Sequence, residues 1–255
     1  MKPSTFTPRL NGGANKGSAS MSTSTPRLLQ VLNIATAVMF LIALGLVFGY
    51  APREATMGEV QRIFYFHVPS AWVGFLAFFV TLVAGIAFLR TGDHKWDRVG
   101  LSSVELGITF SLMTLFSGML WGRPAWNTWW TWDPRLTTFT ILLLIYFAYL
   151  MLRQGIEDPD RRARFASAYG IVGFVSVPIT YFAIQLARSI HPVLFGPANP
   201  NAKGDTPPLA PPMLQTFFYC LFMFTVLYGT LLWHRVRLAN YAQHVEQLKA
   251  KLTSA

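Results

Sequence analysis

The residues with the clearest chemical meaning in this sequence are five tryptophans that fall within twelve positions. They are Trp121, Trp126, Trp129, Trp130 and Trp132, and they lie between two apolar segments. A tryptophan side chain offers a large rigid aromatic surface and one N–H donor, so several together suit a planar, mostly apolar ligand with a polar edge. One or two tryptophans would fit an ordinary aromatic belt at a membrane surface, whereas five in one loop favour a ligand-binding surface.

Two histidines are expected beside this loop. His67 precedes the second long apolar segment and His191 follows the fifth, so both should lie on the membrane face that carries the tryptophans. A single histidine at such a surface is more often an ordinary polar residue than a ligand. Two neutral imidazoles on separate elements, however, can bracket the iron of a haem as axial ligands. The other histidines map to the opposite side; they are His94, His234 and His244.

Three charged residues near the tryptophans are candidates for roles at this site. Arg123 and Arg135 could neutralise haem propionates, because a guanidinium group pairs with a carboxylate through two parallel hydrogen bonds. Arg135 could equally pair with Asp133. Asp133 itself stands directly before Pro134, which favours an N-cap followed by proline at the first helical position. Capping leaves open a second role for Asp133 in positioning the loop.

The segments that must position these residues are long enough to cross a bilayer. The chain is 53% hydrophobic and only 13% charged, and its apolar runs have the length of about twenty residues that a membrane helix needs. Six spans are expected at roughly 28–50, 70–89, 101–121, 136–152, 168–187 and 213–233. Each should be helical, because lipid offers no partner to backbone polar groups. The sequence therefore predicts an all-α polytopic membrane protein.

The distribution of lysine and arginine predicts how these spans are oriented. Fifteen of the 21 basic residues fall on the tail, the second and fourth loops and the C-terminus, and six fall on the other loops. This positive-inside asymmetry predicts two cytoplasmic termini and an outer face that carries His67, His191 and the tryptophan loop. Since the charge reports orientation, it gives no reason to expect nucleic acid as a partner.

The chain divides into three parts by composition. Residues 1–26 are rich in Ser, Thr, Gly and Pro and are expected to form a disordered cytoplasmic tail. Residues 27–233 form the six-helix membrane domain, with the tryptophan-rich loop at 121–137. Residues 234–255 carry apolar side chains at helical spacing, which predicts a cytoplasmic amphipathic helix.

Four smaller features complete this interpretation. The segment from Gly58 to Trp72 has apolar residues at helical spacing, which predicts a separate interfacial helix before the second span. Residues 192–212 contain seven prolines, which favours an extended cover. Glu105 is the only acidic residue well inside a span, and a structural pairing with Arg98 is expected. Cys220 is the only cysteine, which excludes an internal disulfide and covalent haem attachment of the c-type.

These motifs together resemble the CcmC family of haem-handling proteins in the cytochrome c maturation system. The "WWD" signature of that family is similar to the stretch from Trp121 to Thr137, its first ligand motif to the segment from His67 to Trp72, and its second ligand to His191-Pro192. The resemblance extends over essentially all six spans. There are two departures: Asn127 stands where Gly is expected, and residues 185–188, Gln-Leu-Ala-Arg, lack an expected aromatic pair.

The resemblance implies a protein that holds haem b non-covalently at the outer face of the bacterial cytoplasmic (inner) membrane. It implies that His67 and His191 are axial ligands and that the tryptophan loop contacts the porphyrin. The haem would be presented to the haem chaperone CcmE, with the ABC transporter subunits CcmA and CcmB and the small membrane protein CcmD as partners. The sequence carries no phosphate-binding loop, zinc-type cluster or nucleophile–base pair, which favours an assembly factor over a classical enzyme. A b-type electron-transfer cytochrome and a transporter that moves haem across the membrane remain as alternatives.

Overall fold

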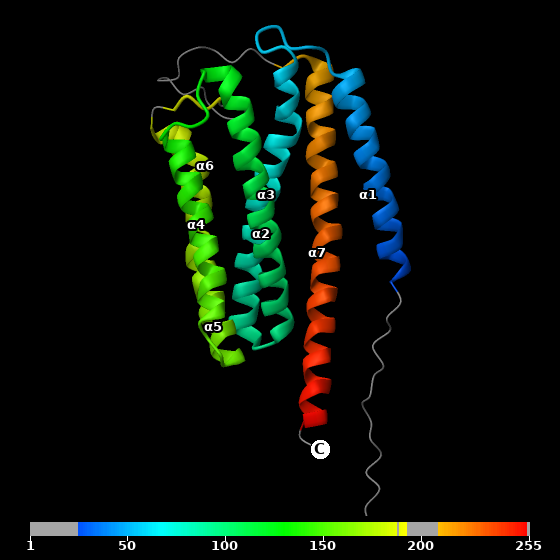
Figure 1. Ribbon diagram of the computed structural model, residues 1–255, viewed down its shortest axis with the longest axis vertical. Coiled ribbons are helices and arrows are strands. Elements are labelled where there is room, and N and C mark those ends of the chain that lie inside the picture. The colour runs from blue at the N-terminus through cyan, green and yellow to red at the C-terminus, as the bar shows by residue number, and fades with distance from the viewer. Residues whose placement is uncertain (1–24, 188, 193–208, 254–255) are drawn as a thin grey trace, which may run out of the picture.

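The protein is an all-helical bundle whose long axis runs along the helices (Figure 1). The structure is a computed structural model and describes residues 25–187, 189–192 and 209–253. Among these residues, six helical segments are long and apolar enough to cross a membrane, as the sequence predicts. The elements are α1 (Arg27–Gly45), a π-helical turn η1 (Leu46–Tyr50), a 3-10 turn η2 (Glu59–Ile63), α2 (Phe64–Thr91), α3 (His94–Trp126), α4 (Pro134–Gln154), α5 (Pro159–Gly173), α6 (Ser176–Leu186) and α7 (Pro211–Thr253). Helices α5 and α6 together make the fifth span.

Aspartate caps set the start of three helices. The Asp93 carboxylate accepts a hydrogen bond from the backbone N–H of Lys95 at the start of α3, and Asp158 does the same for Arg161 in α5. Asp133 accepts from the N–H of Arg135 and is followed by a proline in the first turn of α4. Such caps satisfy backbone donors that a helix leaves free at its N-terminus. The predicted cap at Asp133 is therefore confirmed.

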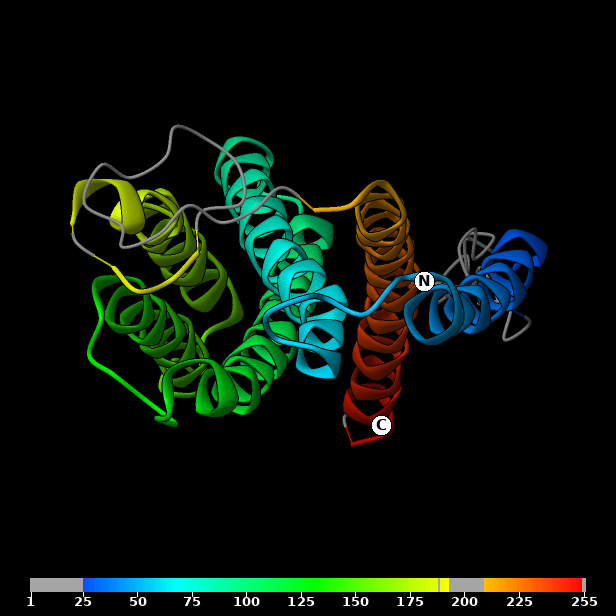
Figure 2. The same ribbon diagram turned by 90° about the horizontal axis from the view of Figure 1, so that it is seen from above.

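Helices α2 and α3 pack against each other along the middle of the bundle. Helices α4, α5 and α6 lie on one side of this pair, α7 lies on the other, and α1 lies outside α7 (Figures 1 and 2). Close approach depends on small residues, because a Cβ added to Gly107 of α3 would come within 2.7 Å of the Phe78 ring of α2. Small residues at helix interfaces are typical of membrane bundles, where van der Waals packing replaces the hydrophobic effect.

The bundle has two apolar cores, one on each side of the α2–α3 pair. One core joins α1, α2, α3 and α7 and includes Val73, Phe110, Phe217 and Phe224. The other joins α2 to α6 and is centred on Tyr146, whose ring stacks on that of Phe78 with centroids 3.5 Å apart. These two cores hold the central helices rigidly and leave the ends of the helices to build the site.

Helix α1 is tied to the bundle mainly through α7. Hydroxyl groups of Thr36 and Thr230 lie 3.1 Å apart in the buried interface. One turn further along α7, His234 contacts Asn33 of α1 at 2.8 Å, and near the start of α7 Gln215 accepts from Tyr50 of η1 at 2.6 Å. The opposite face of α1 carries exposed apolar side chains, which suits contact with lipid.

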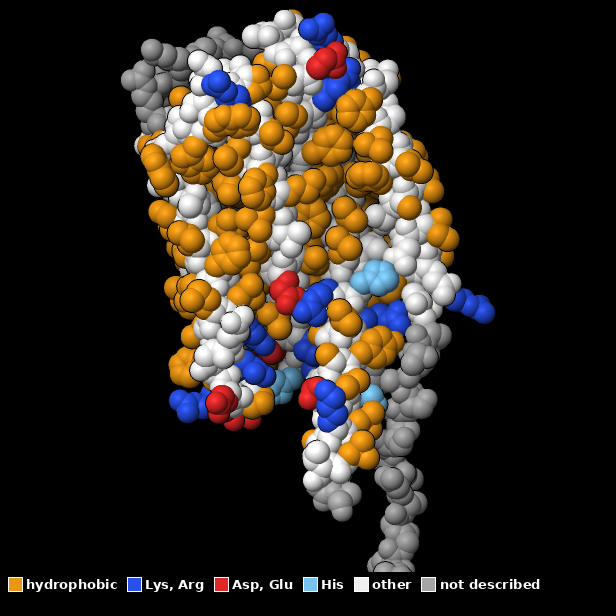
Figure 3. Space-filling model, viewed as in Figure 1, with side chains coloured by type: hydrophobic (Ala, Val, Ile, Leu, Met, Phe, Trp, Pro, Cys, Tyr) orange, Lys and Arg blue, Asp and Glu red, His pale blue; other side chains and the backbone are white. Residues whose placement is uncertain are grey.

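Charged side chains gather at the end of the bundle that carries the C-terminus, below a broad apolar band (Figure 3). Asp97 and Arg153 form a bidentate ion pair there with N–O distances of 2.5 and 2.9 Å. Glu105 pairs with Arg235 of α7 at 2.6 Å. The expected partner, Arg98, donates instead to Gln243, so that pairing was wrong. Sequence proximity suggested Arg98, whereas the packing of α7 on α3 brings Arg235 closer.

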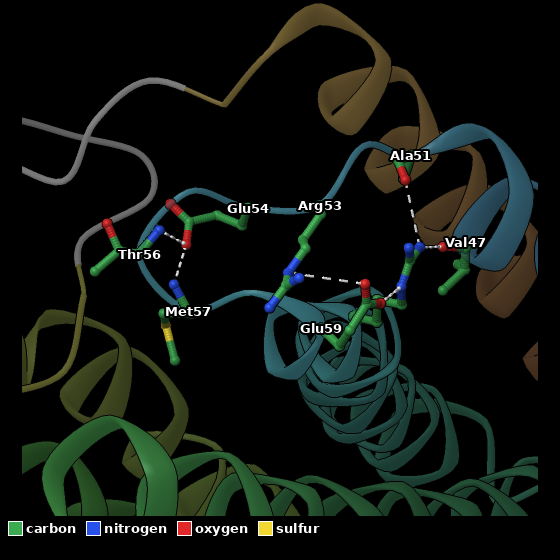
Figure 4. Close-up of polar contacts among 8 residues, drawn as sticks. Val47, Ala51, Arg53, Glu54, Thr56, Met57 and Glu59 are labelled. Carbon is green, nitrogen blue, oxygen red and sulfur yellow. Dashed lines mark hydrogen bonds and ion pairs between the residues drawn. The ribbon is translucent and has the colours of Figure 1, made fainter.

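The loop between α1 and α2 is fastened to the start of α2. Arg62 donates to the carbonyl groups of Val47 and Ala51 and to the Glu59 carboxylate, and Glu54 accepts from the backbone N–H groups of Thr56 and Met57 (Figure 4). The 3-10 turn η2 then runs directly into α2. The prediction of a separate interfacial helix over 58–72 was therefore wrong, because its apolar residues begin the second span.

Helix α7 runs without a break from Pro211 to Thr253. The predicted helix after residue 233 is present as its continuation, and four of its apolar residues are exposed: Leu238, Val245, Leu248 and Leu252. The proposed division at 233/234 thus corresponds to no break in the helix. The predicted N-terminal tail lies almost wholly outside the described residues, and so does most of the proline-rich segment 192–212.

Candidate functional site

A large cavity opens at the end of the bundle opposite the C-terminus. It is lined by α2, α3, α4 and α6, by the loop after α3 and by the segment after α6, and it contains about 1200 Å³ of space with its mouth. Much of its wall is apolar and comes from the parts of the spans nearest this end of the bundle; the apolar lining includes Val68, Phe75, Leu115, Met119, Leu136 and Phe139.

His67 projects into this cavity from the beginning of α2 and is held by α3. Its Nδ1 atom lies 3.0 Å from the hydroxyl oxygen of Ser117. That hydroxyl donates its own hydrogen to the carbonyl of Met113 at 2.6 Å, so it must accept from Nδ1–H of the imidazole. The neutral ring then carries its lone pair on Nε2, the nitrogen free to bind a metal.

Gly118 makes room for this ring. A Cβ added at Gly118 would lie 3.0 Å from Cε1 of His67, closer than ordinary contact allows. Ser117 and Gly118 lie four and three residues before Trp121, which places them near it on the same helix. The sequence analysis did not identify these two residues as part of the site. Their position one helical turn before Trp121 is the signal that could have identified them.

His191 reaches the cavity from the segment that follows α6. Its Nδ1 atom lies 3.1 Å from the carbonyl oxygen of Pro192, and a carbonyl can only accept, so Nδ1 carries the hydrogen. Nε2 again holds the lone pair. Burial, with a smaller effect from the nearby Arg135 guanidinium, lowers the pKa of His191 to about 4. The imidazole is therefore neutral at neutral pH, as a metal ligand must be.

The two imidazoles come together at the cavity wall. Their ring centroids are 6.4 Å apart and the ring planes are inclined by 34°. An imidazole nitrogen binds a metal ion at about 2 Å and lies about 1 Å from its ring centre, so two rings on opposite sides of one ion have centres about 6 Å apart. The observed separation fits a single metal ion held between His67 and His191.

The tryptophan loop contributes four of its five aromatic side chains to the cavity. Trp121, Trp126, Trp129 and Trp130 line it. The rings of Trp121 and Trp126 meet edge to face with centroids 4.9 Å apart. Trp132 does not line the cavity and is 75% exposed. The Trp121 indole nitrogen and the Thr131 hydroxyl are buried without a hydrogen-bond partner among the described residues, which fits a ligand that supplies polar atoms at its edge.

The turn that carries the tryptophans depends on Asn127. This residue has a φ of 55° and is the one non-glycine with positive φ in the described part of the chain. Asparagine adopts this conformation more readily than most residues, so it can take the place of the expected glycine in this turn. Arg123 donates to the backbone and side-chain oxygens of Asn127 at 2.7 and 2.6 Å and does not line the cavity.

Arg135 is the only Lys, Arg, Asp or Glu among the described residues that line the cavity. Its guanidinium group donates to the carbonyl oxygens of Thr180 and Tyr181 on α6, at 2.7 and 2.9 Å. It also lies 6.0 Å from the centres of the Phe75 and Tyr181 rings. The alternative pairing of its side chain with Asp133 is not seen, since that carboxylate contacts the backbone N–H of Arg135 and the segment before His191. Arg135 thus gives the cavity its positive charge.

The remaining histidines described with partners lie elsewhere. His94 contacts Asp160 at 2.8 Å, and His234 contacts Asn33 on α1 at the same distance. Both belong to the charged end of the bundle. Among the described residues, only His67 and His191 are histidines that line the cavity.

These features define a polytopic α-helical membrane protein with an aromatic cavity and a pair of histidines at one membrane surface. Comparison with known proteins gives the family: a model described as "Heme exporter protein C" matches residues 14–251. The chain belongs to this family, as its motifs predicted.

Individual relatives support the same assignment. The chain is 34% identical over 168 residues to a protein named heme exporter protein C from Bradyrhizobium diazoefficiens, a match that covers 66% of this chain and 63% of that protein. It is 34% identical over 166 residues to the protein of that name from Rhodobacter capsulatus, which covers 65% and 69%. With the Escherichia coli K12 protein of that name it shares 27% identity over 220 residues, 83% of this chain and 86% of the relative. The chain thus spans less than two thirds of the length of the Bradyrhizobium relative.

Proposed function

We propose that this protein binds haem b non-covalently at the outer face of the bacterial cytoplasmic membrane and transfers it to the haem chaperone CcmE for c-type cytochrome biogenesis. The observation that carries this proposal is the pair of imidazoles, His67 and His191, whose ring centres lie 6.4 Å apart beside a tryptophan-lined cavity. The family membership supports haem as the cargo. The excess of basic residues at the opposite end supports this orientation.

Each part of the cavity has a distinct task in this proposal. His67 and His191 hold the iron through Nε2, because Nδ1 of each ring is engaged by Ser117 or the Pro192 carbonyl. Trp121, Trp126, Trp129 and Trp130 provide flat surfaces for the porphyrin faces or edge. Arg135 offers positive charge to the propionates, although its guanidinium also supports α6.

Transfer requires a surface that a partner can reach. Trp132 and Trp129 are 75% and 53% exposed, and they lie in the same loop as the less exposed tryptophans. Large exposed aromatic side chains of this kind are enriched where proteins bind one another. We propose that CcmE docks on this part of the loop. The ABC transporter subunits CcmA and CcmB and the small protein CcmD are proposed as further members of the assembly.

The test of ligation is the optical spectrum of the purified protein. His67→Ala and His191→Ala should each reduce haem content and remove the low-spin absorption of a haem with two histidine ligands. His94→Ala is the matched control, because His94 lies at the other end of the bundle. Haem content and spectrum unchanged in both cavity variants would rule out this site.

The alternatives receive less support from the geometry. An electron-transfer cytochrome typically carries electrons across the bilayer between haems, whereas the described histidines form one cavity pair and no second pair at the charged end. A transporter of haem needs a polar or gated path through its helices. Two apolar cores occupy that part of this bundle.

A further inference from the structure

Asp133 occupies an unexpected place beside the cavity. It belongs to the tryptophan loop but does not line the cavity, and its side chain is buried with 8% exposure. One carboxylate oxygen, Oδ1, accepts from the N–H of Arg135 at 2.9 Å and from the hydroxyl of Ser189 at 3.0 Å. The other, Oδ2, accepts from the backbone N–H of Ile190 at 2.9 Å. The carboxylate therefore joins the start of α4 to the segment that carries His191.

The chain of contacts continues to His191 itself. The Ser189 hydroxyl, which donates to Asp133, accepts from the backbone N–H of His191 at 3.1 Å. This segment follows the end of α6, where Ala187 has left the helix for an extended conformation. Its backbone donors have no helical carbonyls to bind, so two of them use the side chains of Asp133 and Ser189. Ser189 is itself only 8% exposed, which keeps water from competing for these bonds.

We infer that Asp133 is a positioning residue for His191: it fixes the backbone of residues 189–191 so that the imidazole meets His67 across the iron site. This inference rests on the proposed function, and it assigns Asp133 no contact with haem. The aspartate of the tryptophan loop thereby couples the aromatic surface to one axial ligand. A displacement of the loop would move Asp133, and with it His191.

The conservative variant Asp133→Asn separates positioning from helix capping. Asparagine caps helices about as well as aspartate, so α4 should keep its start. An amide, however, has one oxygen and one NH2 group, and two donors facing each other cannot bond. With its oxygen on Arg135 N–H, the variant presents NH2 to Ile190 N–H and releases the 189–191 segment. The matched control is Asp158→Asn, the same change at the cap of α5, far from the cavity.

The first measurement uses the haem-free protein, by hydrogen–deuterium exchange of peptides that contain residues 189–192. Loss of a hydrogen bond to a buried charge should accelerate exchange by about tenfold or more in Asp133→Asn. Ser189→Ala should do the same for the N–H of His191, and Ser189→Thr should restore slow exchange because it returns the hydroxyl. Asp158→Asn should leave these peptides unchanged. Exchange in Asp133→Asn equal to that in Asp158→Asn overturns the positioning role.

The second measurement uses the haem-loaded protein. Asp133→Asn should convert part of the low-spin haem to a high-spin form, and free imidazole should restore the low-spin spectrum by taking the place of His191. A low-spin spectrum unaltered in both Asp133→Asn and Ser189→Ala overturns the inference even if exchange is faster. Failure of the proposed haem site is seen separately, as an unchanged spectrum in His191→Ala.

Discussion

Replacement of Gly118 by alanine is a sensitive test of where the His67 ring lies. A Cβ at this position would be 3.0 Å from Cε1 of His67, whereas ordinary contact begins at 3.4 Å. The ring must therefore move by a few tenths of an ångström. The ring cannot move freely, because its Nδ1 atom is hydrogen-bonded to the Ser117 hydroxyl oxygen, 3.0 Å away on the same helix as Gly118. The movement is passed on to Nε2, the atom proposed to bind iron.

The substitution affects two separate quantities, the stability of the haem-free protein and its affinity for haem. Alanine favours a helix over glycine by about 1 kcal/mol, which offsets strain at the His67 ring, so the haem-free protein should remain folded. A metal ligand displaced by part of an ångström loses affinity; for comparison, a misplacement of one ångström in a preorganised catalytic site can cost about a hundredfold in rate. We expect haem affinity to fall about tenfold in Gly118→Ala and further in Gly118→Val.

The assay is a haem titration of the detergent-solubilised protein, followed by absorbance, with thermal unfolding of the haem-free form measured in parallel. Gly229→Ala is the control, because a Cβ there would meet nothing within 4 Å. If Gly118→Ala and Gly118→Val both bind haem as tightly as Gly229→Ala, the His67 ring does not occupy the described position during ligation, and the reasoning is refuted.

Four further outcomes are expected. Trp130→Ala should lower haem affinity, whereas Trp132→Ala should retain haem and reduce loading of CcmE. Equal effects of the two variants on haem affinity and on CcmE loading would contradict the proposal that Trp130 contacts haem and Trp132 contacts CcmE. Because burial lowers the pKa of His191 from 6.5 to about 4, low-spin ligation should persist from about pH 7 to about pH 5, and a spectral loss centred near pH 6.5 would contradict it. Over the same range the stability of the haem-free protein should fall as the pH drops below 6.5, since the unfolded chain takes up the proton first. A cysteine at Ala55 should react with an impermeant thiol reagent in intact cells and one at Glu157 should not; the reverse pattern would invert the proposed orientation.

The membrane helices could be predicted well from the sequence because their cause is local. Runs of apolar residues determine the spans, and caps such as Asp133-Pro134 mark where helices begin. The tryptophan loop and both histidines were also visible, since five tryptophans in twelve positions are more than an aromatic belt at a membrane surface requires. The boundaries of the helices were less predictable. Residues 58–72 were assigned to a separate helix because their apolar residues have helical spacing, but spacing alone cannot show whether such a segment is continuous with the next helix.

Contacts between distant segments were beyond what one sequence can show. Arg98 was expected to form an ion pair with Glu105, but α7 places Arg235, 130 positions away in the sequence, next to that carboxylate. Asp133 could be recognised as a cap from its neighbours, whereas its bonds to Ser189 and Ile190 depend on how α6 packs on α4. The exposure of Trp132 likewise follows from the path of the loop and not from its composition.

The pairing of α1 with α7 affects the order in which this protein can assemble. During synthesis the first helix enters the bilayer long before the last. The contacts of Thr36, Asn33 and Tyr50 cannot form until α7, which carries their partners, has also been inserted. Until then α1 lacks its main partner and is surrounded mostly by lipid, consistent with its apolar outer face. The central helices can pack first, and closure of the bundle is the final event. A chain interrupted before Pro211 should therefore keep α1 in the membrane but leave it undocked.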